Sequence, residues 1–267
     1  VAGKDDEVED LPDAVLPAAG RPGAEVTSPM SELPGGTTFG SLVHAVLETA
    51  DPHAADLEEE LAAEVDRHLA WWPVDAPADV IAAALMPAHH TPLGPLASGH
   101  TLRDIGLDDR LRELDFEIPL AGGDFDTPAA QVTLAEVGDL LSRHLDADDP
   151  VSPYADQLRG PSLGPSSLRG YLAGSIDAVL RLPDGAGGHR YLVVDYKTNR
   201  LGDVQSAAEY GPAQLTEAML HSDYILQALL YTVVLHRFLR WRQADYDPVR
   251  HLGGVLYLFL RGMCGPD

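Results

Sequence analysis

The chain has 267 residues, 45% of them hydrophobic, and a formal net charge of −24 at pH 7. This length suits one large domain or two small ones, and no apolar run approaches the ~20 residues that a membrane-spanning helix needs. A single cysteine, Cys264, excludes an internal disulfide framework and any four-cysteine zinc or iron–sulfur site, and it fits a reducing cytoplasm. The negative charge argues against a surface that coats nucleic acid, although residues 197–261 hold seven Lys and Arg against six Asp and Glu.

The first part of the chain has the composition of a linker. Residues 1–34 combine a charged run at 4–10 with several prolines, which favours an acidic, Pro-rich linker or tail. Structure is expected to begin near residue 35, where a threonine of the Gly-Gly-Thr-Thr run can cap a helix over residues 39–50. The chain starts with Val and stops just after a strong strand pattern, so we expect it to be a piece of a longer polypeptide.

The later patterns alternate between helix and strand. Further helices are expected at about 54–71, 78–86 and 133–145, and strands at 107–120, 174–180, 191–199 and 251–260. A Pro, Ser and Gly-rich loop is expected at 146–169, before the strands at 174–180 and 191–199. An irregular segment at 199–211 follows these strands and leads to a helical stretch, a break near Ser222 and a helix over 223–242. The pattern predicts one α/β domain, with a helical extension at about 35–105 and an α/β core at about 106–267.

Charged side chains occupy two neighbouring predicted strands. Asp177 lies within an apolar run, and Asp195 and Lys197 end the next strand. Side chains alternate along a strand, so Asp195 and Lys197 project to the same face. Carboxylates are ligands that Mg²⁺ prefers, and a lysine can stabilise a developing negative charge. A solvated Asp–Lys pair at a sheet edge is the simpler interpretation, but a second acid within an apolar run favours a functional site.

The order of these residues resembles a known family. Gly-Ser-Ile-Asp at 174–177, Val-Val-Asp-Tyr-Lys-Thr-Asn at 193–199 and the helix that holds Gln227 and Tyr231 are similar to the PD-(D/E)XK nuclease superfamily. Within it the chain is most similar to RecB-type nuclease domains of bacterial helicase–nucleases. The resemblance is specific over residues 170–262 and good over residues 35–48. The resemblance implies a restriction-endonuclease-like α/β core, with a central mixed sheet flanked by helices, and a Mg²⁺-dependent deoxyribonuclease.

The resemblance also implies the catalytic and metal-binding residues. It makes Asp177 and Asp195 metal-binding carboxylates, adds the backbone carbonyl of Tyr196 and the side chain of His44 as further ligands, and makes Lys197 the catalytic lysine. From the residues alone, a lone histidine on an amphipathic helix such as His44 is more often packed or solvated than a metal ligand.

Three further positions match the family less directly. Glu113 would be the first-motif acid, although Asp115 and Glu117 are close enough to share that assignment. Gln227 and Tyr231 match a Gln-X-X-X-Tyr signature and would contact DNA, while their i, i+4 spacing also fits a surface hydrogen-bonded pair. Five other histidines have no partner at metal-ligand spacing and are expected at the surface: His53, His68, His89, His90 and His100.

The implied cofactor is Mg²⁺, with Mn²⁺ as a substitute and no iron–sulfur cluster. The chain has no Gly-X-X-X-X-Gly-Lys motif and therefore no nucleotide site, so an ATP-driven motor would lie outside it. Implied partners are a single DNA strand, RecC-like and RecD-like subunits and RecA, in the cytoplasm and with no membrane. A competing hypothesis, based on the negative charge, is a non-catalytic acidic docking module that binds partner subunits or loads a recombinase.

Overall fold

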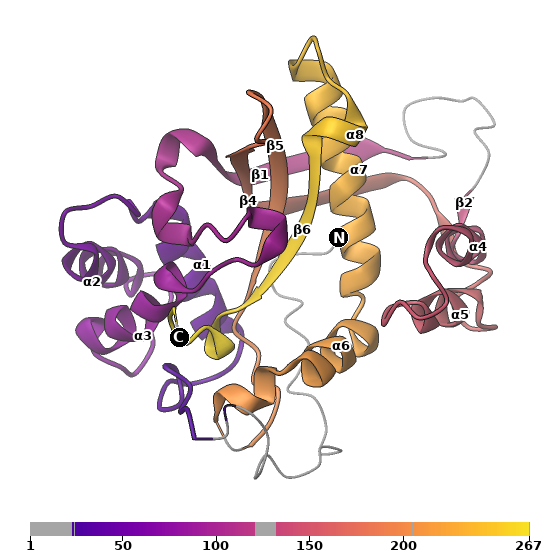
Figure 1. Ribbon diagram of the computed structural model, residues 1–267. Coiled ribbons are helices and arrows are strands. Elements are labelled where there is room, and N and C mark those ends of the chain that lie inside the picture. The colour runs from indigo at the N-terminus through magenta and orange to yellow at the C-terminus, as the bar shows by residue number, and fades with distance from the viewer. Residues whose placement is uncertain (1–22, 24, 121–131, 204, 267) are drawn as a thin grey trace.

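A mixed sheet of four strands forms the centre of the computed structural model, which describes residue 23 and residues 25–120, 132–203 and 205–266 (Figure 1). The strand order is β1 (Arg110–Pro119), β4 (Tyr171–Pro183), β5 (His189–Lys197) and β6 (Leu252–Phe259). β4 is antiparallel to both β1 and β5, while β5 and β6 are parallel. The expected α/β fold, a central mixed sheet flanked by helices, is confirmed.

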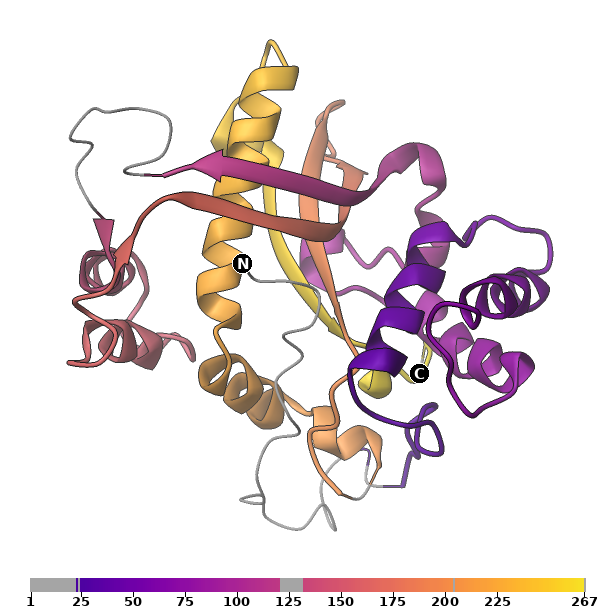
Figure 2. The ribbon, with the colours of Figure 1, turned by 180° about the vertical axis from the view of Figure 1, so that it is seen from behind.

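Three N-terminal helices cover one face of this sheet: α1 (Thr37–Thr49), α2 (Leu57–His68) and α3 (Ala78–His90). Figure 2 shows α1 lying closest to the strands, with α2 and α3 outside it. One apolar face of α1 is buried in a core that includes strand residues such as Leu180 and Leu192; its residues are Phe39, Val43, Val46 and Leu47. Three short 3₁₀ helices, η1 (Pro95–Ala97), η2 (Leu102–Asp104) and η3 (Leu107–Asp109), lead into β1.

The cap predicted for the first helix is wrong. Its N-cap is Gly36 at φ 90°, no side chain caps it, and Thr37 and Thr38 already belong to the helix. A positive φ is open to glycine at little cost, so the backbone turn at Gly36 sets where the helix begins.

α7 (Tyr224–Arg242) covers the opposite face of the sheet. Its Tyr231, Val234, Leu235 and Leu239 are buried against strand residues Ile176, Val179 and Val193. The break expected near Ser222 is confirmed, since α6 (Pro212–His221) ends there and meets α7 at 79°. No single described helix is long and apolar enough to cross a membrane; α6 and α7 reach that length and composition only as a bent pair.

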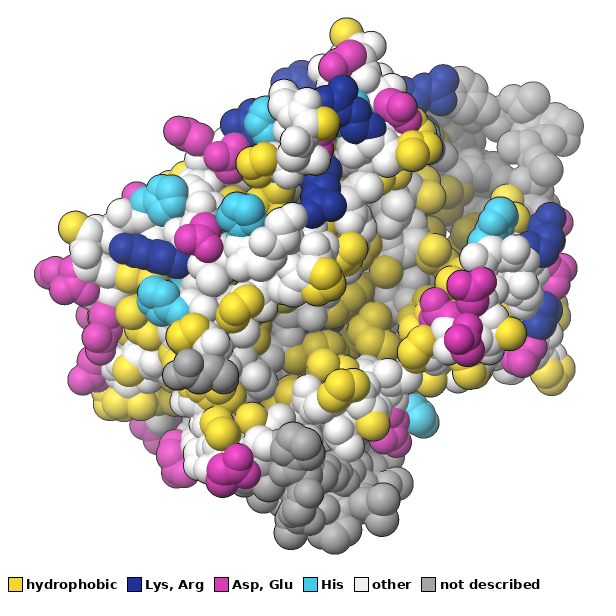
Figure 3. Space-filling model, in the orientation of Figure 1, with side chains coloured by type: hydrophobic (Ala, Val, Ile, Leu, Met, Phe, Trp, Pro, Cys, Tyr) yellow, Lys and Arg dark blue, Asp and Glu magenta, His cyan; other side chains and the backbone are white. Residues whose placement is uncertain are grey.

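A small unit lies beside α7, on the side away from α1–α3 (Figure 1). It contains α4 (Leu134–His144), α5 (Pro153–Arg159) and the two-stranded sheet of β2 (Val132–Thr133) and β3 (Ser167–Leu168). The loop expected over 146–169 therefore contains a helix and a strand, because Pro at the first position of α5 is compatible with a helix start. Hydrophobic side chains line the hollow between this unit and α7 (Figure 3).

Packing begins before residue 35, earlier than the linker prediction allows. Met30 and Leu33 are 0% and 3% exposed and belong to the main core. The guanidinium of Arg261, fully buried after β6 in η5 (Leu260–Gly262), donates hydrogen bonds to the carbonyls of Met30, Leu33 and Pro34. Most of the predicted linker, residues 1–22 and residue 24, lies outside the described residues.

Two further histidine predictions are wrong. His89 is 1% exposed, with Nδ1 against the carbonyl of Leu85 one turn earlier in α3. His68 is partly buried and pairs with Glu64, 3.7 Å away, on the same helix. Both rings lie on the core-facing sides of their helices. The surface prediction was based on the spacing to possible metal-ligand partners, and this spacing gives no information about burial.

The remaining elements are short. η4 (Ala207–Tyr210) precedes α6, and α8 (Pro248–His251) precedes β6. The side chain of Asp247 caps α8 by accepting a hydrogen bond from the backbone of Val249.

Candidate active site

The pairing of β1 with β4 is interrupted where two acids face each other. Arg112 pairs with Ala178 and Leu114 pairs with Ile176, which leaves Glu113 and Asp177 opposite each other without a ladder pairing. Glu113 has φ 46°, a left-handed conformation that costs a residue with a side chain about 1 kcal/mol or more. The irregularity changes which way β4 side chains point, because Ile176 packs with α7 whereas Ala178 packs with α1.

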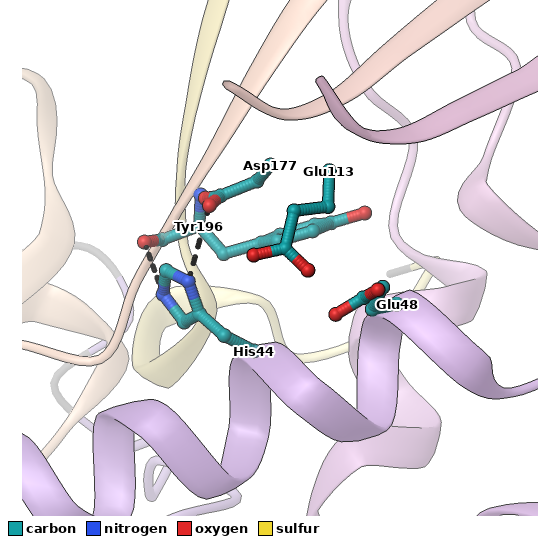
Figure 4. Close-up of a pocket in the computed structure, with 5 residues that line it drawn as sticks. All are labelled: His44, Glu48, Glu113, Asp177 and Tyr196. Carbon is teal, nitrogen blue, oxygen red and sulfur yellow. Dashed lines mark hydrogen bonds and ion pairs between the residues drawn. The ribbon is translucent and has the colours of Figure 1, made fainter. Parts of the chain in front are cut away.

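His44 joins α1 to the two central strands. Its Nδ1 lies 3.2 Å from Oδ1 of Asp177, and its Nε2 lies 2.9 Å from the carbonyl oxygen of Tyr196 (Figure 4). Oδ2 of Asp177 accepts a hydrogen bond of 2.8 Å from the backbone N–H of Tyr196. Side chains from α1 and β4 and the backbone of β5 therefore converge on one point.

Asp177 is held in its ionised form. Burial alone would raise the pKa of this carboxyl, but the charge and hydrogen bond of His44, the N–H of Tyr196 and the charge of Lys197 outweigh it and lower the pKa below its ordinary value. An ionised carboxylate in a nearly buried position is an expected property of a cation ligand.

Asp195 and Lys197 form an ion pair at the end of β5. Nζ of Lys197 lies 2.8 Å from Oδ2 of Asp195, and the two side chains are 10% and 5% exposed. Burial raises the pKa of Asp195 to about 6, although the charge of Lys197 opposes the shift. Burial alone would lower the pKa of Lys197, but Asp195 and Tyr224 raise it. The prediction that both side chains share one face is confirmed.

A small pocket lies beside His44 and Asp177. It is lined by His44, Glu48, Glu113, Asp177 and Tyr196. Figure 4 shows His44 and Glu48 rising from α1 toward Asp177 and Glu113 on the strands. Glu113 therefore lines the same pocket as His44 and Asp177. This position favours Glu113 over Asp115 and Glu117 as the acid of the family's first motif.

The donor atoms suit a divalent cation, although they are not gathered into one closed cluster. Among the described residues, no three His, Cys, Asp or Glu side chains lie close enough to hold one ion. One predicted ligand is the Tyr196 carbonyl rather than a side chain, and Asp195 is turned toward Lys197. Apart from that ion pair, the buried Oδ2 of Asp195 has no hydrogen-bond partner among the described residues, so it can still accept a cation.

Gln227 and Tyr231 lie on α7 and contact each other, but not as a surface pair. Nε2 of Gln227 donates to the hydroxyl of Tyr231 at 3.0 Å, and that hydroxyl donates to the carbonyl of Ser175 at 2.9 Å. Tyr231 is 9% exposed. Its hydroxyl thus links α7 to β4 two residues before Asp177, and a contact of either residue with DNA stays a prediction.

Sequence reasoning missed three residues of this site. Glu48 is one turn after His44 on α1, and that i, i+4 spacing was the signal for it. Tyr224 and Tyr257 lie against the ammonium of Lys197, at 4.3 and 5.7 Å from their ring centroids. No local pattern points to these tyrosines, because they approach Lys197 from α7 and β6.

Comparison with known proteins identifies the family of the chain. The chain matches the family described as the PD-(D/E)XK nuclease superfamily over residues 21–264. It is 65% identical, over 98% of its length, to the RecBCD enzyme subunit RecB of Mycobacterium tuberculosis (strain ATCC 25618 / H37Rv). It is 58% identical over 99% of its length to the same subunit of Mycolicibacterium smegmatis, and 37% identical over 62% to that of Escherichia coli (strain K12).

The chain spans 24% of the length of each mycobacterial relative and 12% of the Escherichia coli one. The family match, by contrast, covers nearly all of the chain, including every residue of the pocket. The chain therefore belongs to the PD-(D/E)XK nuclease superfamily.

Proposed function

We propose that this chain is a Mg²⁺-dependent nuclease domain that hydrolyses phosphodiester bonds of DNA, with Mn²⁺ as a substitute metal. The observation that carries the proposal is the meeting of His44, Asp177 and the Tyr196 carbonyl beside a buried Asp195–Lys197 pair. Family membership supports a nuclease, and the oxygen-rich donor set with one imidazole supports a divalent cation.

The proposed ligands are His44, Asp177, Asp195 and the carbonyl oxygen of Tyr196. When bound there, the cation would supply Lewis-acid chemistry, which lowers the pKa of water and neutralises charge on a phosphate. Asp177 contributes a carboxylate that its surroundings keep ionised. Its hydrogen bond from the Tyr196 N–H holds the Asp177 carboxylate beside this residue of β5.

Lys197 is the proposed catalytic residue. Its ammonium is almost buried, so its charge acts in a region of low dielectric where electrostatic stabilisation is strong. We propose that it orients the attacking water and stabilises the negative charge that develops on the scissile phosphate, leaving 5′-phosphate and 3′-hydroxyl ends. Glu113, at the rim of the pocket, would complete the acidic lining.

The relatives are subunits of enzymes named RecBCD, and we infer that this chain acts as the nuclease part of a longer subunit in a similar cytoplasmic assembly. In that setting a DNA strand reaches the site with the help of RecC-like and RecD-like partners during double-strand break repair and recombination. Contact with backbone phosphate predicts little base preference at this site. A docking role toward RecA or partner subunits stays an alternative prediction.

Cleavage of end-labelled single-stranded DNA by the purified chain tests the proposal. With Mg²⁺ present, we expect Lys197→Met and Asp195→Asn to lower the cleavage rate by roughly 10²–10³-fold, the loss typical when one stabilising group is removed. With EDTA in place of Mg²⁺, the parent chain should not cut.

Asp184→Asn is the matched control. Like Asp195, Asp184 forms an ion pair at 2.8 Å, in this case between its Oδ2 and Nε of Arg250, but it lies at the far end of the β4–β5 hairpin. This variant should cut as fast as the parent. Equal rates for the parent and for Lys197→Met, or for the parent with and without Mg²⁺, would show that the proposed function is wrong.

A further inference from the structure

Two tyrosines outside the proposed set of ligands enclose the ammonium of Lys197. The rings of Tyr224 and Tyr257 stack with their centroids 5.3 Å apart and an angle of 26° between their planes. Nζ of Lys197 lies 4.3 Å from the first centroid and 5.7 Å from the second. An aromatic face attracts a cation, most strongly where water is excluded, and Lys197 is only 8% exposed.

These rings belong to two elements that neighbour the site. Tyr224 is the first residue of α7 and is 6% exposed. Tyr257 pairs with Asp195 in the register of β5 and β6, so the two side chains lie side by side on the same face of the sheet. The ammonium therefore has Asp195 on one side and an aromatic wall on the other.

A chain of hydrogen bonds connects the stacked rings of Tyr224 and Tyr257 to β4, the strand that contains Asp177. The hydroxyl of Tyr257 lies 2.8 Å from Oε1 of Gln227 and 2.9 Å from the carbonyl of Tyr224, and it donates its single hydrogen to one of them at a time. The other end of the Gln227 amide donates to Tyr231, which donates to the carbonyl of Ser175. Each donor in the chain thus has an acceptor, and β6, α7 and β4 are joined beside the active site.

We propose that Tyr224 and Tyr257 are positioning residues that hold the Lys197 ammonium against Asp195, an inference that rests on the proposed nuclease function. The stacked rings limit where Nζ can move, and the hydroxyl of Tyr257 keeps the rings in register with β4. Both residues act through Lys197, so their loss should slow the chemical step more than it weakens the binding of DNA.

Substitutions at Tyr224 separate this role from ordinary core packing. Tyr224→Phe keeps the ring, and we expect its kcat to stay within about threefold of the parent. Tyr224→Leu removes the ring, and we expect kcat to fall about tenfold with KM for DNA nearly unchanged, a loss between those of an exposed and of a desolvated cation–π contact. Tyr246→Leu is the matched control, because Tyr246 stacks on His251 at the same angle of 26° away from Lys197.

A second pair of variants tests the hydrogen-bond chain. Tyr257→Phe and Tyr231→Phe each break one link but keep their rings. If the chain acts as a unit, the double variant should lose no more activity than the more impaired single variant. Additive losses would contradict the proposed connection between β6 and β4.

Amine labelling provides a readout that does not require cleavage. Lys4 and Lys197 are the only lysines of the sequence, so peptide mass spectrometry can follow Lys197 with Lys4 as an internal reference. We expect Lys197 to be labelled severalfold faster in folded Tyr224→Leu than in the parent or in Tyr224→Phe. Thermal unfolding of each variant confirms that the labelled protein is folded.

The outcomes distinguish this inference from the proposed function. A parent chain that fails to cut DNA contradicts the nuclease proposal, whereas the labelling rates still test whether the tyrosines restrain Lys197. Unchanged labelling and unchanged kcat in Tyr224→Leu, or an equal loss in Tyr224→Phe and Tyr224→Leu, overturns the positioning role.

Discussion

Nε2 of His44 lies 2.9 Å from the carbonyl oxygen of Tyr196, a residue that comes 152 positions later in the chain. Nδ1 of the same ring faces Oδ1 of Asp177. The charge of His44 that lowers the pKa of Asp177 belongs to the protonated ring, which donates to both oxygens. A ring that binds a metal must be neutral, so a cation at this point would take the place of a proton between His44 and its two oxygen partners.

Replacing His44 should therefore weaken metal binding. Loss of an outer hydrogen bond to a metal ligand typically costs 10–100-fold in affinity, so we expect His44→Ala to weaken Mn²⁺ binding by at least about tenfold, as measured by calorimetry. His221→Ala is the control, since His221 is exposed on α6 and its Nδ1 lies 3.0 Å from the carbonyl oxygen of Glu217 in the same helix. Equal affinities in His44→Ala and the parent would contradict a ligand role.

The left-handed backbone at Glu113 leads to a prediction that separates stability from activity. Glycine adopts φ 46° without strain, so we expect Glu113→Gly to leave the free energy of unfolding within about 1 kcal/mol of the parent, while DNA cleavage falls. Ser98→Gly relaxes a similar φ of 54° away from the pocket and should leave cleavage unchanged. A fully active Glu113→Gly variant would show that Glu113 has no role in DNA cleavage.

Arg261 predicts a large effect on stability from a residue outside the pocket. Its guanidinium is fully buried and donates to the carbonyls of Met30 and Thr198, at 2.7 and 2.6 Å. Arg261→Met removes both of these buried hydrogen bonds, so we expect a loss of roughly 3 kcal/mol or more in urea unfolding. Limited proteolysis should then cut near residues 28–34. The exposed Arg242→Met should show neither effect.

His89 predicts how stability depends on pH. Burial lowers its pKa in the folded chain from 6.5 to about 4. The folded state therefore keeps this ring neutral while the unfolded state takes up a proton, and the stability that is present above pH 6.5 is lost as the pH falls toward 4. At pH 5 the loss amounts to about 2 kcal/mol.

Urea unfolding at pH 7 and pH 5 checks this prediction. The difference between the two pH values should be about 2 kcal/mol smaller in His89→Met than in the parent. His90→Ala is the matched control, because its exposed side chain follows His89 directly on α3. The same pH dependence in the parent and in His89→Met would show that His89 is not the responsible group.

The sequence allowed most of the fold to be predicted where the patterns are local. Hydrophobic spacing placed the helix around His44 and the strands of Asp177 and Asp195, and the resemblance grouped these three residues. The break in the β1–β4 ladder at Glu113 could not be predicted, because a left-handed φ depends on the strand opposite. Likewise, Tyr224 and Tyr257 meet Lys197 only through the packing of α7 against the sheet.

The central claim is that His44, Asp177, Asp195 and the Tyr196 carbonyl hold one divalent cation. A crystal structure of the chain soaked with Mn²⁺, with anomalous scattering recorded, tests it most directly. We predict one strong anomalous peak whose distances to oxygen and nitrogen ligand atoms of these four residues are about 2.0–2.3 Å. A peak elsewhere, or none at a Mn²⁺ concentration that supports DNA cleavage, would contradict the account.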